Sequence, residues 1–248
     1  AYYNNLISWP VDSDIRDYQD AFGNRKLLRN ATAGFTGELD NPFWDVHRNR
    51  SFDKNDRLTG NVTLNYQPLS WITVSGIIGL DHYITEGNYF VHPQSYYGAP
   101  VGGLASTYTD NFRLFNGTIR TTLTRSFSKK VTNSLTLGFF AEDARNTINS
   151  QRGERFYEKD FYSMNNTDPT SQAAKYTERN QRKARFFGQY TLGYNNIAFL
   201  NLGGSYEGVS TLMRGLKDFY NDPFFAYGSV SGSFVFSDLS GFKDALPF

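Results

Sequence analysis

Residues 56–84 constrain the fold more than any other stretch, because apolar and polar side chains alternate along them with a period of two. In residues 56–66 the apolar set is Leu58, Val62, Leu64 and Tyr66, and the polar set is Arg57, Thr59, Asn61, Thr63 and Asn65. After a tight connection at residues 67–70, residues 72–84 repeat the alternation. Successive side chains of a β-strand point to opposite faces. The stretch therefore predicts a hairpin with one apolar and one polar face, which suits lipid on one side and water on the other.

The same alternation recurs further along the chain, around residues 113–125, 135–142, 184–194, 198–207 and 227–236. We therefore predict an all-β chain of about seven antiparallel strands. Short connections follow the first, third and fifth strands, and long ones follow the second, fourth and sixth. This asymmetry is typical of a transmembrane β-barrel, which has short periplasmic turns and long extracellular loops.

The same pattern predicts how the chain is organised. Residues 1–53 are expected to form an extracellular loop region with a helical turn at residues 15–22, residues 54–236 to carry the barrel strands, and residues 237–248 to form a periplasmic turn. Long extracellular loops are expected at residues 85–111, 146–181 and 208–222.

The strand count is odd, whereas single-chain bacterial barrels have an even number of strands, from 8 upward. An open set would leave unpaired edges in lipid, at a cost of several kcal/mol for each unpaired group. We therefore expect the chain to be a contiguous piece of a larger barrel. An eighth strand within residues 1–53 is the alternative.

Composition agrees with a barrel and narrows the function. The chain is 17% aromatic, yet its mean hydropathy is negative. Its 25 basic and 24 acidic residues give no positive excess for a nucleic acid to exploit. It has no cysteine, so disulfides and thiolate chemistry are excluded.

No motif indicates catalysis or a cofactor. The three histidines, His47, His82 and His92, are too scattered for a short metal-binding motif. A nucleophile elbow, a phosphate-binding loop and a dinucleotide-binding fingerprint are all missing from the sequence. We therefore expect no catalytic residues, no metal and no cofactor, and we expect that the protein is not an enzyme.

A binding surface is what the remaining residues offer. The aromatic residues predicted to bind ligand are Trp44, Tyr89, Phe90, Tyr96 and Tyr97, whose rings suit sugar faces or peptide side chains. Packing of the loops against each other is an equally good explanation for any one of them. The residues predicted to face the lumen are Arg57, Asn61, Arg120, Arg185 and Gln189. They would line a solute path or contact an internal plug.

Three runs carry a family resemblance. They are Asn41-Pro42-Phe43-Trp44, then residues 56–62, then residues 66–72. Together they resemble the mid-barrel region of SusC/RagA-like TonB-dependent outer-membrane transporters of Bacteroidetes. Residues 199–239 are similar to the family's later region, although residues 205–210 and Phe234 depart from its usual pattern.

The resemblance implies a 22-stranded barrel with an N-terminal plug, multi-pass in the bacterial outer membrane and in contact with its lipid. It implies a TonB complex that acts through the plug, and a SusD-like lipoprotein that helps to capture oligosaccharides or peptides. Two alternatives stay open: a small complete outer-membrane barrel with a structural or adhesion role, and a secreted carbohydrate-binding β-sandwich. For the importer we expect Leu64, Ile78, Leu137 and Leu202 to contact lipid.

Overall fold

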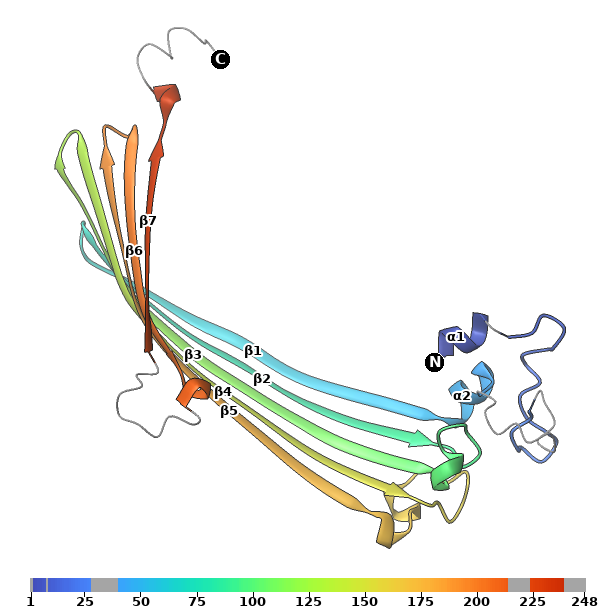
Figure 1. Ribbon diagram of the computed structural model, residues 1–248. Coiled ribbons are helices and arrows are strands. Elements are labelled where there is room, and N and C mark those ends of the chain that lie inside the picture. Colours follow the sequence, from blue (N-terminus) through green and yellow to red (C-terminus); the bar gives the residue numbers. More distant parts are fainter. Residues whose placement is uncertain (1, 8, 28–39, 214–223, 239–248) are drawn as a thin grey trace. The chain divides into compact units, whose positions relative to one another are not determined.

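The computed structural model describes residues 2–7, 9–27, 40–213 and 224–238. These residues form a single antiparallel sheet in which each strand pairs with its neighbour in the sequence, in the order β1 to β7 (Figure 1). The strands are β1 (Arg50–Leu69), β2 (Ile72–Val91), β3 (Leu104–Ser128), β4 (Val131–Glu154), β5 (Ala173–Tyr194), β6 (Ala198–Val209) and β7 (Phe224–Phe234). The prediction of about seven antiparallel strands is confirmed.

The helices are short. They are α1 (Tyr2–Ile7), α2 (Pro42–Arg48), η2 (Ala99–Val101), η3 (Met164–Asn166), η4 (Pro169–Ser171), η5 (Ser210–Met213) and η6 (Phe236–Asp238). The helical turn predicted at residues 15–22 is wrong, because this segment is irregular and Gln19 forms an antiparallel bridge with Arg25.

None of the helices in the described residues has both the length and the apolar character needed to cross a membrane.

The chain divides into two compact units, and the strands run through both. The first, here called the loop unit, comprises Ala1–Asp56, Tyr83–Asn111 and Thr147–Glu178. The second, here called the strand unit, comprises Arg57–His82, Phe112–Asn146 and Arg179–Phe248.

The register of β5, β6 and β7 confirms the predicted faces. Tyr190 pairs with Leu202 and Leu202 with Val230, so these apolar residues share one face. On the other face Thr191 pairs with Asn201, whose amide oxygen accepts a hydrogen bond of 2.7 Å from the threonine hydroxyl.

Cross-strand polar pairs continue along this second face, here called the polar face of the strand unit. They are Arg57 with Asp81 (2.8 and 2.7 Å), Ser75 with Asn65 (2.7 Å) and Thr122 with Thr136 (3.0 Å). Pairs of this kind stabilise neighbouring strands.

The opposite face, here called the apolar face, is exposed. Leu64 keeps 72% of its surface exposed and Leu202 keeps 40%. Other exposed residues of this face are Leu58, Val62, Tyr66, Ile78, Phe115, Ile119, Leu137, Phe186, Tyr206, Val230 and Phe234. The buried hydrophobic side chains of the described residues are Trp44, Phe90, Val91 and Ala105, all in the loop unit.

The connections alternate between short and long, as predicted. Short turns join β1 to β2, β3 to β4 and β5 to β6. In the last of these, Asn195 and Asn196 have φ values of 52° and 56°, which is the left-handed conformation expected of this dipeptide.

The strands are longer than predicted, so the loops are shorter. Strands β2 and β3 leave residues 92–103 between them rather than 85–111, and β4 and β5 leave residues 155–172 rather than 146–181. Strand β6 continues to Val209, within the predicted loop 208–222, most of which lies outside the described residues. Strand β1 begins at Arg50, within the predicted loop region 1–53. Most of the predicted turn at 237–248 also lies outside the described residues.

The sheet bears on the alternatives left open by the sequence. Apart from the start of β1, the described residues of 1–53 contain no strand, so no eighth strand is found there. Because the described strands form one sheet with β1 and β7 at its edges, a two-layered β-sandwich is excluded for this part of the chain.

Candidate ligand-binding site in the loop unit

Helix α2 brings Trp44 into the centre of the loop unit. The side chain of Asn41 caps the helix by accepting a hydrogen bond from the Phe43 N–H (2.8 Å), and Pro42 occupies the first turn, where its missing N–H costs nothing. Trp44 is fully buried, and its indole N–H donates to the Ser95 hydroxyl at 2.9 Å. The Trp44 and His92 rings meet in a T-shaped contact, with their centroids 5.0 Å apart.

One amide joins α2 to the segment that follows β2. Asn49 Oδ1 accepts from the Ser95 hydroxyl (2.8 Å) and from the His92 backbone N–H (2.9 Å). Its Nδ2 donates to Asp45 at 2.6 Å, which orients the amide. Buried polar groups are stable only when they are hydrogen-bonded in this way.

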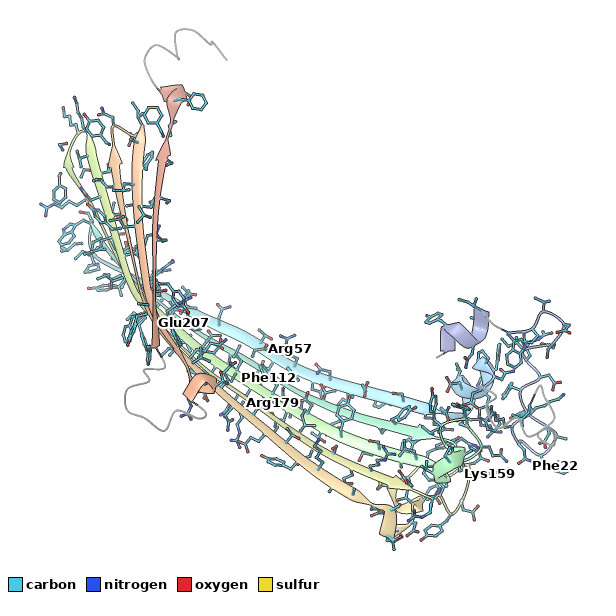
Figure 2. The ribbon with its side chains drawn as sticks, viewed as in Figure 1. Phe22, Arg57, Phe112, Lys159, Arg179 and Glu207 are labelled. Atoms are coloured by element: carbon cyan, nitrogen blue, oxygen red, sulfur yellow. The ribbon has the colours of Figure 1, made fainter. Side chains whose placement is uncertain are left out.

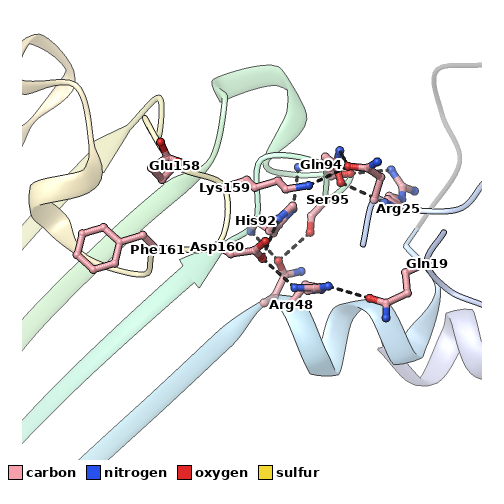
Figure 3. A network of polar contacts seen from close by, with 12 residues as sticks. Gln19, Arg25, Arg48, His92, Gln94, Ser95, Glu158, Lys159, Asp160 and Phe161 are labelled. Atoms are coloured by element: carbon pink, nitrogen blue, oxygen red, sulfur yellow. Dashed lines mark hydrogen bonds and ion pairs between the residues drawn. The ribbon is translucent and has the colours of Figure 1, made fainter. Parts of the chain in front are cut away.

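Arg48 adds two further segments to this network (Figure 3). Its Nη1 donates to Asp160 in the β4–β5 connection at 2.8 Å, and its Nη2 donates to Gln19 at 2.8 Å. Its guanidinium also lies 5.6 Å from the centroid of the Trp44 ring. Hydrogen bonds therefore hold together four stretches that are far apart in the sequence: α2, the segment after β2, the β4–β5 connection and the segment around Gln19.

His92 is a buried base in this network. Its Nδ1 accepts the Gln94 backbone N–H (3.1 Å), so the neutral ring carries its proton on Nε2, 3.6 Å from Asp160 Oδ1. Burial lowers the pKa of His92 to about 4, against a smaller opposing effect of Asp160. The imidazole is therefore neutral at pH 7.

Asp40 and Arg25 hold the next turn in place. The Asp40 carboxylate accepts the Tyr96 N–H at 2.9 Å on each oxygen and lies 3.0 Å from Arg25 Nε. Burial raises the pKa of Asp40 to about 6, although Arg25 and the Tyr96 N–H oppose the rise. Arg25 also donates from its backbone N–H to Gln94 Oε1 at 3.1 Å.

The backbone at Gly98, directly after Tyr97, lies too close to the His92 carbonyl group to leave room for a side chain. A Cβ on Gly98 would lie 2.0 Å from the His92 carbonyl oxygen, so only glycine fits there. Because Gly98 folds back on His92, the two tyrosines before it stand at the turn.

A hollow of about 530 Å³ opens at this turn, lined by Arg25, Tyr96, Tyr97, Ala99 and Pro100. The two tyrosine rings meet edge to face, 5.0 Å apart, and Tyr97 keeps 62% of its surface exposed. The volume is within the range of small-ligand pockets. The lining offers two phenol rings, a proline ring and the Arg25 side chain, which can pack against and hydrogen-bond a polar solute.

The structure separates the five aromatic residues predicted to bind ligand. Tyr96 and Tyr97 line the hollow, and Tyr89 is also exposed. Trp44 and Phe90 are buried and pack the loops together, which was the alternative explanation for this set. Phe90 meets the Tyr162 ring at 6.0 Å. Arg25 was missed, because its partners Asp40 and Gln94 lie 15 and 69 residues away and are brought to it only by folding.

The five residues predicted to face the lumen all lie in the strand unit. Arg57 is paired with Asp81, and Arg185 lies 4.0 Å from Glu207 and 5.5 Å from the Phe187 ring. Asn61, Arg120 and Gln189 are exposed. In the described part of the chain, no group of three or more His, Asp or Glu side chains is placed to hold a metal ion.

The sequence matches no protein-family model and no curated protein. The structure is similar to that of the RagAB peptide transporter, with a TM-score of 0.69 and 12% sequence identity over 81% of this chain and 22% of the other. It is also similar to the RagAB peptide importer in the open-open state (TM-score 0.68, 13% identity, 79% and 21% covered) and in the closed-closed state (0.68, 12%, 79% and 21%). The chain spans about a fifth of the length of the chains that it matches. The seven strands thus have the fold of part of a RagA-type TonB-dependent transporter barrel, as the sequence resemblance predicted.

Proposed function

We propose that the chain forms part of the barrel wall, with its extracellular loops, of a TonB-dependent importer in a bacterial outer membrane. The observation that carries this proposal is the division of the strand unit into an exposed apolar face and a hydrogen-bonded polar face. In a transmembrane barrel the apolar face contacts lipid and the polar face lines the lumen. Leu64, Ile78, Leu137 and Leu202 are all exposed, as lipid contact requires.

In this proposal the long connections lie outside the cell and the short turns lie in the periplasm. The hollow beside Tyr96 and Tyr97 captures an oligosaccharide or a peptide, and Arg57, Asn61, Arg120, Arg185 and Gln189 line the path inward. A SusD-like lipoprotein assists capture, and a TonB complex supplies energy through an N-terminal plug. The sequence resemblance supports both partners, and no enzymatic step is involved.

A growth experiment tests the proposal. A strain that lacks the gene is compared with its parent on a peptide digest and on oligosaccharides as the only carbon source. An importer predicts slower growth of the deletion strain on one of these, restored by the wild-type gene. Equal growth on all of them, together with an altered cell envelope, would favour the structural role instead.

The same strains test the hollow. Tyr97→Ala removes an exposed ring from its lining, and we expect capture to weaken about 2- to 10-fold, as for the loss of an aromatic contact. Tyr157→Ala is the matched control, because Tyr157 is an equally exposed loop tyrosine that does not line the hollow. Uptake rates are compared at equal protein levels in the membrane. Equal uptake by the two variants would remove the hollow from the proposal.

A further inference from the structure

The strand unit contains a second hollow, of about 390 Å³, that the sequence patterns did not indicate. It is lined by residues of β3, β4, β5 and η5, among them Asn146, Arg179, Asn180, Gln181, Ser210 and Thr211. Arg179 and Gln181 alternate in step with Arg185 and Gln189, so they belong to the polar face. Phe112 of β3 forms an apolar wall near Arg179 (Figure 2).

Arg179 differs from the basic residues that follow it in β5, which have acidic partners. Arg182 is paired with Asp143 at 2.9 Å, and Lys183 is paired with Glu142 at 2.9 Å. Among the described residues, no hydrogen bond or ion pair engages the Arg179 guanidinium. The residues that line the hollow include no Asp or Glu, so its lining carries one uncompensated positive charge.

The chemistry of this lining fits one kind of group. A guanidinium presents parallel N–H donors that match the two oxygens of a carboxylate, and such pairs are stronger than neutral hydrogen bonds. The amide of Gln181 and the hydroxyl of Thr211 can hydrogen-bond the polar atoms next to that carboxylate. The volume is at the lower end of the range for ligand pockets, which suits a terminal residue or one sugar ring.

We propose that this hollow is a carboxylate-binding subsite in which Arg179 binds an acidic group of the imported solute. The inference rests on the proposed function, because it places the subsite on the face along which the solute passes. A peptide C-terminus and an acidic sugar both supply the required group.

Binding to the full-length protein, purified in detergent, tests the subsite by titration calorimetry. The probes are N-acetyl-trialanine, its C-terminal amide, galacturonic acid and the methyl ester of galacturonic acid. We expect at least one acid to bind, and its uncharged partner to bind about 10-fold or more weakly. Binding of the peptide acid alone identifies a peptide source, and binding of the sugar acid alone identifies a sugar source. If neither acid binds, or an acid binds no better than its uncharged partner, the proposal is wrong.

Three variants assign the effect to the guanidinium. Arg179→Gln should weaken binding of the acid about 10- to 100-fold and leave binding of the uncharged probe unchanged. Arg179→Lys should retain part of the affinity, because it keeps the charge but not the planar fork. Arg182→Gln removes the same charge from the opposite face of the strand and should not alter binding. Equal affinity of Arg179→Gln and wild type for the acid would also overturn the proposal.

The result is independent of the growth experiment. If the purified protein binds an acid through Arg179 while the deletion strain grows normally, the importer role fails and the subsite stands. If growth depends on the gene but Arg179→Gln binds normally, the subsite fails and the importer role stands.

Discussion

Asp40 and His92 are both buried in the loop unit, and burial moves their pKa values in opposite directions. For His92 the pKa falls from 6.5 to about 4, so the folded state disfavours the proton. Its contribution to stability is complete above pH 6.5 and is lost as the pH falls toward 4. For Asp40 the pKa rises from 3.8 to about 6, so its contribution is complete below pH 3.8 and is lost as the pH rises through 6.

Single substitutions should therefore separate the two opposing effects of pH on the stability of the loop unit. In Asp40→Asn only the His92 effect remains, and we expect hydrogen-exchange protection of loop amides to fall as the pH is lowered from 6.5 to 4. In His92→Gln only the Asp40 effect remains, and protection should rise over the same range. At roughly 1.4 kcal/mol per pKa unit, the effect is at most about 3.5 kcal/mol for His92 and about 3 kcal/mol for Asp40.

Wild-type protein should lie between the two variants, because its two contributions partly cancel. Protection factors, corrected for the intrinsic pH dependence of exchange, provide the measurement. Parallel curves for the two variants would contradict the assignment of these pKa shifts.

At the same scale, the sequence indicated some of the residues that line the two hollows and not others. Tyr96 and Tyr97 could be found because a Tyr-Tyr-Gly-Ala-Pro run marks an exposed turn. Aromatic residues that only pack the loops together, such as Trp44, cannot be told from Tyr96 and Tyr97 in the sequence. Their burial depends on contacts such as that of Trp44 with Ser95, 51 residues away. Arg25 and Arg179 carry no local signal at all, because their roles arise from side chains brought together by folding.

At the scale of single elements, the faces of the strands were predictable and their ends were not. Residues 57–66 alternate because one side of β1 is apolar and the other is polar. Residues 50–55 of the same strand are mostly polar on both sides, so the alternation disappears while the backbone pairing continues. Crossing a bilayer takes only about 9–11 residues, whereas β1 to β5 have 20–25. The alternation of apolar and polar residues therefore reveals only the part of a strand whose two faces differ in polarity.

The β5–β6 turn yields a prediction at this scale. Asn196 has a φ of 56°, a conformation that glycine adopts freely and a β-branched residue resists. Asn196→Gly should leave the unfolding free energy within about 0.5 kcal/mol of wild type, and Asn196→Val should lower it by about 1–2 kcal/mol. Urea titration of the protein in lipid vesicles measures both.

Lys130→Val in the β3–β4 turn is the control, because Lys130 does not have a positive φ. It should be tolerated in the same assay. If Asn196→Val and Lys130→Val destabilised the protein equally, the turn conformation would not be the cause.

At the scale of the whole molecule, the two faces of the strand unit predict two environments. Cysteine placed at Leu64 or Leu202 and labelled with a fluorophore should be quenched strongly by brominated lipids, because both side chains lie on the apolar face. A label at Thr63, the next residue on the opposite face, should be quenched little. The chain itself contains no cysteine that would compete for the label.

Equal quenching at Leu64 and Thr63 would contradict the assignment of faces. Quenching at Thr63 alone would place lipid on the polar face, and the importer wall would then be wrong.

The buried apolar side chains Trp44, Phe90, Val91 and Ala105 all belong to the loop unit, while the apolar side chains of the strand unit are exposed. Within the described residues, the hydrophobic effect in water therefore stabilises the loop unit, and in the proposed importer a bilayer supplies the apolar surroundings of the strand unit. The stability of the loop unit and that of the strand unit therefore depend on different surroundings. A denaturant dissolved in water competes directly with the packing around Trp44, whereas a change of lipid or detergent acts on the strands, so the two can lose their structure in separate steps.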